Sequence, residues 1–223
     1  MKKIILKDVK VRFKEHLALD IPNFELKGGV KLAVTGESGS GKSTLLNVLC
    51  LLESISGGRI FWNNKRVDDL SQMEKDRFRY ENVGLVMQEF YLYSGLSAMQ
   101  NVLLPLKFRY LKIPKQLSNR AFYLLERLNI TEYSKNIDLL SRGEKQRVAI
   151  ARALINSPKV IIADEPTASL DAQNSTHAVK LLLSLADEMG SAFICATHDK
   201  NLAEQLTYSL ELKKGKKLEA SFA

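Results

Sequence analysis

The first third of the chain alternates apolar and polar side chains, which is typical of β-strands with one buried face. Apolar residues recur at every second position over residues 5–13, with Lys7 as the exception, and again over residues 17–21. Further along, the pair Asn63-Asn64 separates two short strand-like runs, as the turn of a hairpin does. The pattern therefore predicts an antiparallel β portion at the N-terminus.

Four short apolar runs predict the buried strands of a mostly parallel sheet. They are residues 32–34, 83–86, 160–163 and 192–197. Helical patterns alternate with these runs, and strands that alternate with helices favour an α/β fold.

The segment between about residues 101 and 156 has a helical pattern only. From Ala121 to Leu128, apolar residues recur at i, i+3, i+4 and i+7, which places them on one helix face. We therefore expect a helical lobe inserted into one domain. The expected parts are a core with the β portion, residues 1–88 and 157–223, and a helical lobe, residues 89–156.

Composition and charge are those of a globular protein with a basic surface. The 223 residues carry a net charge of +8, which permits contact with nucleic acid, anionic lipid or solvent alone. The densest basic cluster, residues 213–217, predicts a solvated hairpin, with a membrane-surface contact as the alternative. No apolar run approaches the roughly 20 residues that span a bilayer, and Lys7-Asp8 interrupts the N-terminal apolar run, so we expect a cytoplasmic protein. Cys50 and Cys195 lie in apolar runs and are expected to be buried thiols.

A glycine-rich loop lies between an apolar strand and an apolar helix and is the strongest chemical signal in the chain. It has the pattern G-x-x-x-x-G-K-[S/T], in which backbone N–H groups and a helix N-terminus bind phosphate. The alternative is a turn that only connects two elements. Lys42 is placed to reach the β- and γ-phosphates, and the Ser43 hydroxyl is placed to bind Mg²⁺. The predicted binding residues are Gly36, Glu37, Ser38, Gly39, Ser40, Gly41, Lys42, Ser43 and Thr44.

Two adjacent carboxylates end the apolar run 160–163. Buried strands seldom end in paired acids unless a positive charge meets them. We expect Asp164 to face the metal ion, directly or through water, and Glu165 to act as the general base toward an attacking water. Two exposed acids at a strand end are the alternative.

Residues 140–147 precede a strongly predicted helix. Ser141 and Gly143 at its N-terminus suggest a second anion site made of backbone N–H groups and a hydroxyl. An ordinary N-cap serine is the alternative, and by itself the better one.

Taken together, these motifs resemble those of the ATP-binding-cassette (ABC) ATPases over essentially the whole chain. The matching stretches, in order, are the Walker A loop 36–44, Gln88 after a strand, the signature 140–144, the Walker B run that ends in Asp164-Glu165, and His198 after Ala196-Thr197. Ser169-Leu170-Asp171 matches the D-loop of that family, and Phe13 occupies the place of its adenine-stacking aromatic residue.

The resemblance implies a phosphate-loop α/β core with an antiparallel β portion and a helical lobe, and Mg²⁺-dependent hydrolysis of ATP. It also implies a head-to-tail homodimer that forms with ATP, each nucleotide lying between one Walker A loop and the other subunit's signature. Gln88 would sense the metal and the water, and His198 would contact the γ-phosphate. The signature residues implied to meet the nucleotide are Ser141, Arg142, Gly143 and Glu144, together with Asp171.

Residues 86–90 and 98–106 are similar to the branch of the family that contains lipoprotein-release, macrolide-export and cell-division ATPases. This implies the motor subunit of an export or extraction complex with a separate membrane permease, peripheral on the cytoplasmic face of the inner membrane. The alternatives are the ATPase of a mechanical signalling complex that controls cell-wall enzymes, and a soluble ATPase that acts on nucleic acid or ribosomes. No nucleic-acid partner is expected, since the chain lacks a second cassette and a long coiled-coil insertion.

One residue departs from the family pattern: Arg142 stands where the signature usually has the first of two glycines. If this position required a positive φ, an arginine would cost about 1 kcal/mol there. It also places a cation beside the expected γ-phosphate site. We expect Arg142 to tune closure of the dimer without abolishing it.

Overall fold

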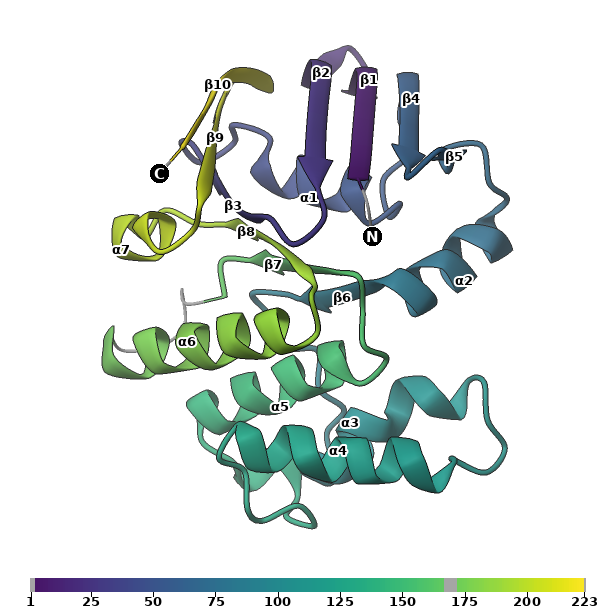
Figure 1. Cartoon of the computed structure of the whole chain (residues 1–223), viewed down its shortest axis with the longest axis vertical. Helices are drawn as coiled ribbons and strands as arrows, with labels where there is room; N and C mark the ends of the chain where they lie inside the picture. Colours follow the sequence, from purple (N-terminus) through teal and green to yellow (C-terminus); the bar gives the residue numbers. More distant parts are fainter. Residues whose placement is uncertain (1–2, 167–171, 223) are drawn as a thin grey trace.

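A computed structural model describes residues 3–166 and 172–222 (Figure 1). Within these ranges the strands form one ten-stranded sheet in the order β5-β4-β1-β2-β10-β9-β3-β8-β7-β6. The strands are β1 Lys3–Phe13, β2 His16–Lys27, β3 Lys31–Thr35, β4 Gly57–Trp62, β5 Lys65–Arg66, β6 Val83–Val86, β7 Val160–Asp164, β8 Ala192–Ala196, β9 Tyr208–Lys213 and β10 Lys216–Phe222. The helices are α1 Lys42–Leu49, α2 Gln72–Asn82, α3 Ala98–Lys107, α4 Lys115–Arg127, α5 Arg142–Leu154, α6 Ala172–Glu188 and α7 Lys200–Glu204, with a 3₁₀ turn η1 at Ile137–Leu139.

The sheet has an antiparallel end and a parallel end. Strand β1 pairs antiparallel with β2 and with β4, and β4 pairs with β5 across the predicted Asn63-Asn64 turn. Strands β9, β3, β8, β7 and β6 run parallel to one another. The α/β core with an antiparallel β portion is confirmed.

The parallel strands are buried on both faces, so two hydrophobic clusters share them. Along β8, Phe193 and Cys195 face the cluster that contains the helical lobe, whereas Ile194 faces the cluster under the antiparallel strands. Since successive side chains of a strand point to opposite faces, the same five residues complete both cores. The central sheet therefore belongs to the hydrophobic cores at both ends of the molecule.

Helices α3, α4 and α5 lie together below the sheet in Figure 1 and form the expected helical lobe. The predicted apolar face of α4 is buried, with Ala121 and Leu125 fully covered. Helix α5 contacts both α3 and α4 and also α6, so it links the lobe to the core. The exact bounds of the lobe as a separate unit stay a prediction.

The predicted C-terminal lysine hairpin is formed by β9 and β10 and rests on the phosphate loop. The Gly215 N–H donates to the Ser40 carbonyl at 2.9 Å, and the Asp20 N–H donates to the Gly215 carbonyl at 2.7 Å. Gly215 has φ +76°, and a Cβ there would lie 2.5 Å from the Ala18 carbonyl oxygen. Only glycine allows this close approach of the hairpin to β2.

The remaining expectations concern the membrane and the cysteines. Among the described residues, none of the helices is both long and apolar enough to cross a bilayer. Cys50 and Cys195 are free and buried, as expected. Burial raises the pKa of the Cys50 thiol to about 12, so this thiol is inert.

Candidate nucleotide-binding site

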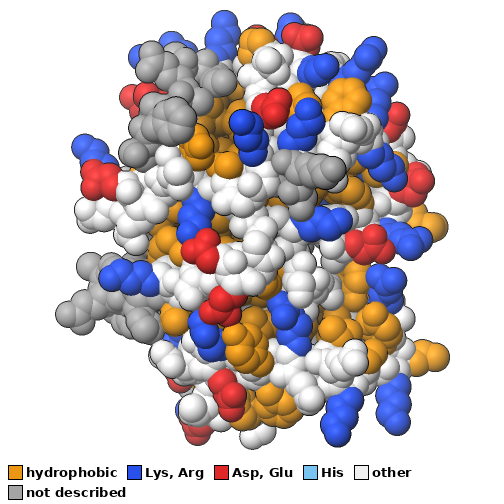
Figure 2. Space-filling model, in the orientation of Figure 1, with side chains coloured by type: hydrophobic (Ala, Val, Ile, Leu, Met, Phe, Trp, Pro, Cys, Tyr) orange, Lys and Arg blue, Asp and Glu red, His pale blue; other side chains and the backbone are white. Residues whose placement is uncertain are grey.

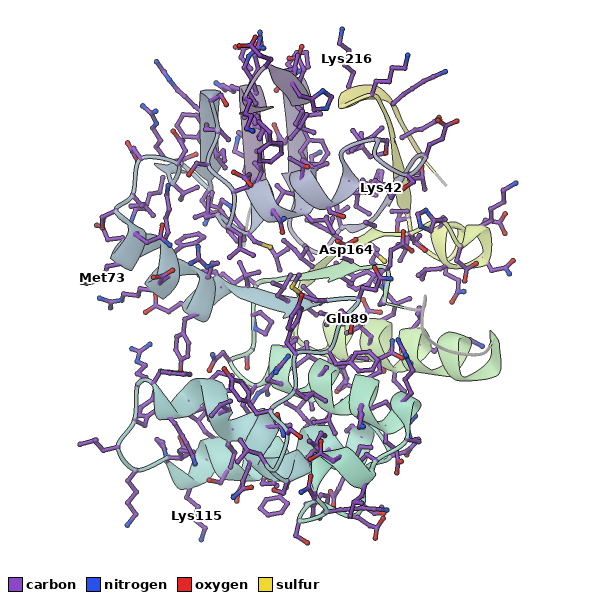
Figure 3. The ribbon with its side chains drawn as sticks, turned by 180° about the vertical axis from the view of Figure 1, so that it is seen from behind. Lys42, Met73, Glu89, Lys115, Asp164 and Lys216 are labelled. Atoms are coloured by element: carbon purple, nitrogen blue, oxygen red, sulfur yellow. The ribbon has the colours of Figure 1, made fainter. Side chains whose placement is uncertain are left out.

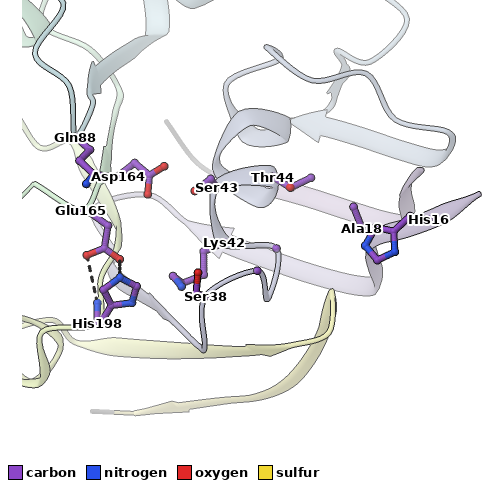
Figure 4. A pocket seen from close by; sticks show the side chains of 12 residues that line it. His16, Ala18, Ser38, Lys42, Ser43, Thr44, Gln88, Asp164, Glu165 and His198 are labelled. Atoms are coloured by element: carbon purple, nitrogen blue, oxygen red, sulfur yellow. Dashed lines mark hydrogen bonds and ion pairs between the residues drawn. The ribbon is translucent and has the colours of Figure 1, made fainter. Parts of the chain in front are cut away.

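Four parallel strands end at one edge of the sheet and bring the predicted site residues together. Loops that follow β3, β6, β7 and β8 meet there, at the carboxyl end of the strands, where α/β sheets bind ligands. They surround a cavity of about 290 Å³ (Figure 4). Its lining comprises His16, Ala18, Ser38, Gly39, Gly41, Lys42, Ser43, Thr44, Gln88, Asp164, Glu165 and His198.

The phosphate loop depends on glycine where it leaves β3. Gly36 has φ +140°, and a Cβ there would lie 2.3 Å from the Leu212 carbonyl oxygen and 2.6 Å from the Ser40 hydroxyl. Gly41 then caps α1 in the left-handed conformation, and no side chain caps this helix. The N–H groups at the start of α1 consequently stay open toward the cavity, which is the arrangement that binds phosphate.

Lys42 supplies the positive charge of the loop. Its side chain is only 7% exposed, and its Nζ donates to the carbonyls of Gly36 at 2.9 Å and Glu37 at 3.1 Å. Among the described residues, no carboxylate lies within 4 Å of this ammonium group. A nearly buried cation that is held by carbonyls alone is positioned to meet an anion.

Glu165 is the second charged group of the cavity, at the end of β7. Its backbone has φ +45°, and its N–H donates to the Ala196 carbonyl at 2.9 Å. This strained position turns the carboxylate toward His198, whose Nε2 lies 2.8 Å from Oε1 (Figure 4). Burial raises the pKa of the Glu165 carboxyl, while His198 and Lys42 partly oppose the rise. A carboxylate with a raised pKa is suited to accept a proton from water near neutral pH.

Three oxygen donors of the cavity fit a magnesium ion bound with a triphosphate. They are the Ser43 hydroxyl in the first turn of α1, the Gln88 amide after β6 and the Asp164 carboxylate at the end of β7 (Figure 4). The described residues contain no cluster of three or more His, Cys, Asp and Glu side chains. Mg²⁺ needs none here, because it commonly binds through one or two protein oxygens plus phosphates and waters.

Phe13 is not among the residues that line the cavity. It ends β1, is 47% exposed, and lies across the strand pair from His16. His16 and Ala18 of β2 line the cavity instead. The alternation of β2 was visible in the sequence, but nothing in it showed which strand would face the phosphate loop. Stacking of Phe13 on adenine stays a prediction.

The signature residues lie outside the cavity, at the N-terminus of α5. The Ser141 hydroxyl accepts from the Glu144 N–H at 3.3 Å, and the Glu144 carboxylate accepts from the Ser141 N–H at 2.8 Å. Hydrogen bonds from the side chain and the backbone N–H of Ser141 lower the pKa of the Glu144 carboxyl. The pair is a capping box, so the ordinary N-cap role of Ser141 is real. The capping box does not use the backbone N–H groups of Arg142 and Gly143, so a second anion site at this helix end stays a prediction.

The backbone of Arg142 does not have the positive φ that was considered from the sequence. Arg142 is the first residue of α5 and is not among the positions with positive φ, so the arginine costs no left-handed strain. Its guanidinium lies over the Phe90 ring, 5.8 Å from the centroid. Phe90 follows Gln88 by two residues. The substituted signature residue is thus joined to the segment that carries Gln88.

The other predicted residues divide into three groups. Glu37 and Ser40 line a smaller cavity of about 120 Å³ between the phosphate loop and β9. Gly36 shapes the loop, and its carbonyl accepts a hydrogen bond from Lys42 Nζ. Gly143 lies in the first turn of α5. Asp171 lies outside the described residues. Gln146 was not predicted from the sequence. It is buried in α5, and its side-chain amide donates to the Pro166 carbonyl just after Glu165.

The fold and the cavity together define a phosphate-loop nucleotide-binding protein. Comparison with known proteins narrows this class. The sequence model of the ABC transporter family matches residues 19–168. The lipoprotein-releasing system ATP-binding protein LolD of Treponema denticola is 41% identical over 194 residues, which cover 86% of this chain and 85% of that protein. The protein of the same name from Francisella tularensis is 37% identical over 206 residues, with coverage of 91% and 89%.

Solved structures agree with the sequence relatives. A dimeric bacterial ABC transporter cassette superposes with a TM-score of 0.89 at 34% identity, and 98% of each chain is covered. A dimeric cassette in a post-hydrolysis state with ADP and phosphate gives 0.88 with the same identity and coverage. The chain therefore belongs to the ABC transporter family, of which it is an ATP-binding cassette. It binds ATP and is an ATPase.

Proposed function

We propose that this cassette drives a lipoprotein-releasing complex through a separate membrane permease. The observation that carries the proposal is the cavity, which joins a phosphate loop to Glu165, in a chain 41% identical to a lipoprotein-releasing ATP-binding protein over 86% of its length. Such an assembly places the chain on the cytoplasmic face of the inner membrane, bound to its permease.

Hydrolysis follows from the charges around the cavity. Lys42 and the N–H groups of the loop stabilise negative charge on the β- and γ-phosphates. Glu165 accepts a proton as a water attacks the γ-phosphorus, the bond to the β-phosphate oxygen breaks, and ADP and phosphate leave. His198 holds Glu165 and the γ-phosphate in position. Mg²⁺, when bound by Ser43, Gln88 and Asp164, would neutralise charge on the phosphates.

The position of the signature supports a head-to-tail dimer. Ser141 to Glu144 do not line the cavity of their own chain, yet the N-terminus of α5 is open to an anion. A second copy can place this helix end against the γ-phosphate, which completes the site from both sides. One related ABC transporter cassette is dimeric in two solved structures.

The complex type is tested by capture from native membranes. Glu165→Gln protein, which is expected to hold ATP without turnover, is incubated with detergent-solubilised membranes, ATP and Mg²⁺, and bound chains are identified by mass spectrometry. A permease with a lipoprotein in the same complex supports the proposal. A permease that comes with cell-division proteins would indicate the signalling alternative. RNA or ribosomal proteins without a membrane chain would contradict transport. Lys42→Ala protein is the control, since it should not reach the ATP-bound state.

A further inference from the structure

The turn between α3 and α4 exposes large apolar side chains among positive charges. Phe108 is 85% exposed, and Leu111 is as exposed as in an extended peptide, at 111%. Residues 107–115, which we call the α3–α4 tip, contain Lys107, Arg109, Lys112 and Lys115 and no acidic residue. Exposed bulky apolar residues that alternate with cations are typical of segments at a membrane–water interface.

The exposure of Phe108 and Leu111 is fixed by the residues between and beside them. Tyr110 and Ile113 pack against the core of the helical lobe. The N–H groups of Arg109 and Tyr110 donate to the Leu106 carbonyl at 3.0 and 2.9 Å. Because the neighbours point inward, the two apolar side chains must point outward.

Arg109 attaches the base of the tip to the core. Its guanidinium lies 3.4 Å from the Glu81 carboxylate at the end of α2, and 5.6 Å from the Tyr80 ring centroid. This leaves Lys107, Lys112 and Lys115 as the exposed cations beside Phe108 and Leu111. Among the described residues no salt bridge involves any of these three lysines.

The tip also lies away from the surfaces that the ATPase uses. It joins α3 to α4 at the side of the lobe opposite the phosphate loop and the start of α5 (Figure 1). The tip lies at the lower right of Figure 1, and in the same orientation hydrophobic and basic side chains are adjacent on that part of the surface (Figure 2). Lys115 extends from the lobe far from Lys42 (Figure 3). A second cassette that completes the nucleotide site therefore leaves the tip uncovered.

We propose that the α3–α4 tip is a weak anchor for an anionic lipid surface. Phe108 and Leu111 enter the interfacial region, and the three lysines contact acidic headgroups. Two apolar side chains and a few cations give only marginal binding alone, so the tip would orient a cassette that its permease already holds near the membrane. The proposal is independent of nucleotide hydrolysis.

Vesicle co-sedimentation tests the proposal on the whole chain. The protein is mixed with vesicles of equal parts phosphatidylglycerol and phosphatidylcholine, or of phosphatidylcholine alone. We expect binding to the anionic vesicles only, and a drop of about tenfold in the partition coefficient for Phe108→Ser/Leu111→Ser. Met73→Ser is the matched control, because Met73 is 82% exposed beside charges of both signs in α2 (Figure 3). It should bind as the parent does.

Two outcomes would overturn the lipid assignment. Equal binding by the parent and the double variant would show that general positive charge, such as that of the C-terminal hairpin, is responsible. Absence of vesicle binding, with weaker capture of the permease by the double variant, would show a protein contact instead. ATPase activity, unchanged in all variants, confirms that they are folded.

A fluorescence measurement locates the tip independently. The parent contains one tryptophan, Trp62, which is 3% exposed and gives a constant background. In Leu111→Trp protein, brominated lipids should quench the added emission on anionic vesicles only. Emission that stays unquenched in the bound protein would show that the tip does not enter the interface.

Discussion

The phosphate loop and the signature segment both lie at helix N-termini, but they differ in what surrounds them. The phosphate loop starts α1 with no side-chain cap and adjoins Lys42, Asp164 and Glu165 in one cavity. The signature starts α5 with a complete capping box and lines no part of that cavity. One chain thus forms the cavity around the phosphate loop, and under the proposed head-to-tail dimer the signature acts on the cavity of a second chain.

Because of this difference, the roles of the loop residues can be tested in a single chain, whereas the proposed role of the signature requires two chains. Changes in the loop should affect nucleotide binding itself. Changes in the signature should leave binding to one chain intact and affect only what requires two chains. Substitutions in the two regions should therefore differ in their effects on ATP binding and on turnover.

Loss of the lysine should have the largest effect. Lys42→Ala removes the nearly buried ammonium group from the phosphate loop, and charge-assisted contacts to phosphate are among the strongest in proteins. We expect ATP affinity to fall by at least about 100-fold. Isothermal titration calorimetry measures this, and Lys145→Ala is the control, because Lys145 lies in α5 outside the cavity. Unchanged affinity would refute the role of Lys42.

Loss of the carboxylate should stop turnover but not binding. Glu165→Gln keeps the size of the side chain and removes the proton acceptor. We expect turnover to fall by about 10² to 10⁴-fold, with ATP affinity within a few fold of the parent. Phosphate release and nucleotide titration on the same preparation measure the two quantities. A variant that turns over at half the parental rate would exclude Glu165 as general base.

Two substitutions of Ser141 separate its cap role from its role toward a second chain. Ser141→Ala removes the cap and should lower the free energy of unfolding by about 1 kcal/mol. Ser141→Asp keeps a good cap, but it places a negative charge where the partner's γ-phosphate would lie. We expect the aspartate variant to be as stable as the parent, to bind ATP normally and to lose most turnover. Full activity in Ser141→Asp would contradict the second anion site.

These residues also show what sequence could predict. The loop, Asp164 and Glu165 were predictable because their chemistry is local: glycines, a lysine and two acids adjoin in the chain. His16 and Gln146 were not, since each reaches its place through long-range packing, β2 beside the phosphate loop and α5 beside Pro166. The backbone strain considered for Arg142 does not occur, because it required a positive φ, and the sequence alone does not determine φ at this position.

The pH dependence of stability tests the environment of Glu165. Its folded-state pKa is raised by burial above the ordinary value of 4.5, so between these values the folded state binds more protons than the unfolded state. Stability contributed by this group is therefore present below pH 4.5 and is lost as pH rises through the raised pKa. We expect Glu165→Gln to be more stable than the parent at pH 7, and the difference to shrink toward pH 4.5. Thermal unfolding measures it, and a constant difference across this range would contradict the assigned burial.

The smallest effect is expected at Arg142. Because this residue is helical, Arg142→Gly should lower the free energy of unfolding by up to about 1 kcal/mol, and it removes the contact with Phe90. Arg142→Ala, which keeps helix propensity, isolates the contact. We expect both variants to bind ATP normally and to change turnover by a few fold. If turnover and affinity were both unchanged in the two variants, Arg142 would have no role in closure.

The central claim, that a second copy completes the site, is tested most directly by the mass of Glu165→Gln protein in solution. Sedimentation equilibrium should show a monomer without nucleotide and a dimer with saturating ATP, while Glu165→Gln/Ser141→Asp protein should remain monomeric with ATP. If Glu165→Gln protein stayed monomeric with ATP bound, a second copy would not complete the site.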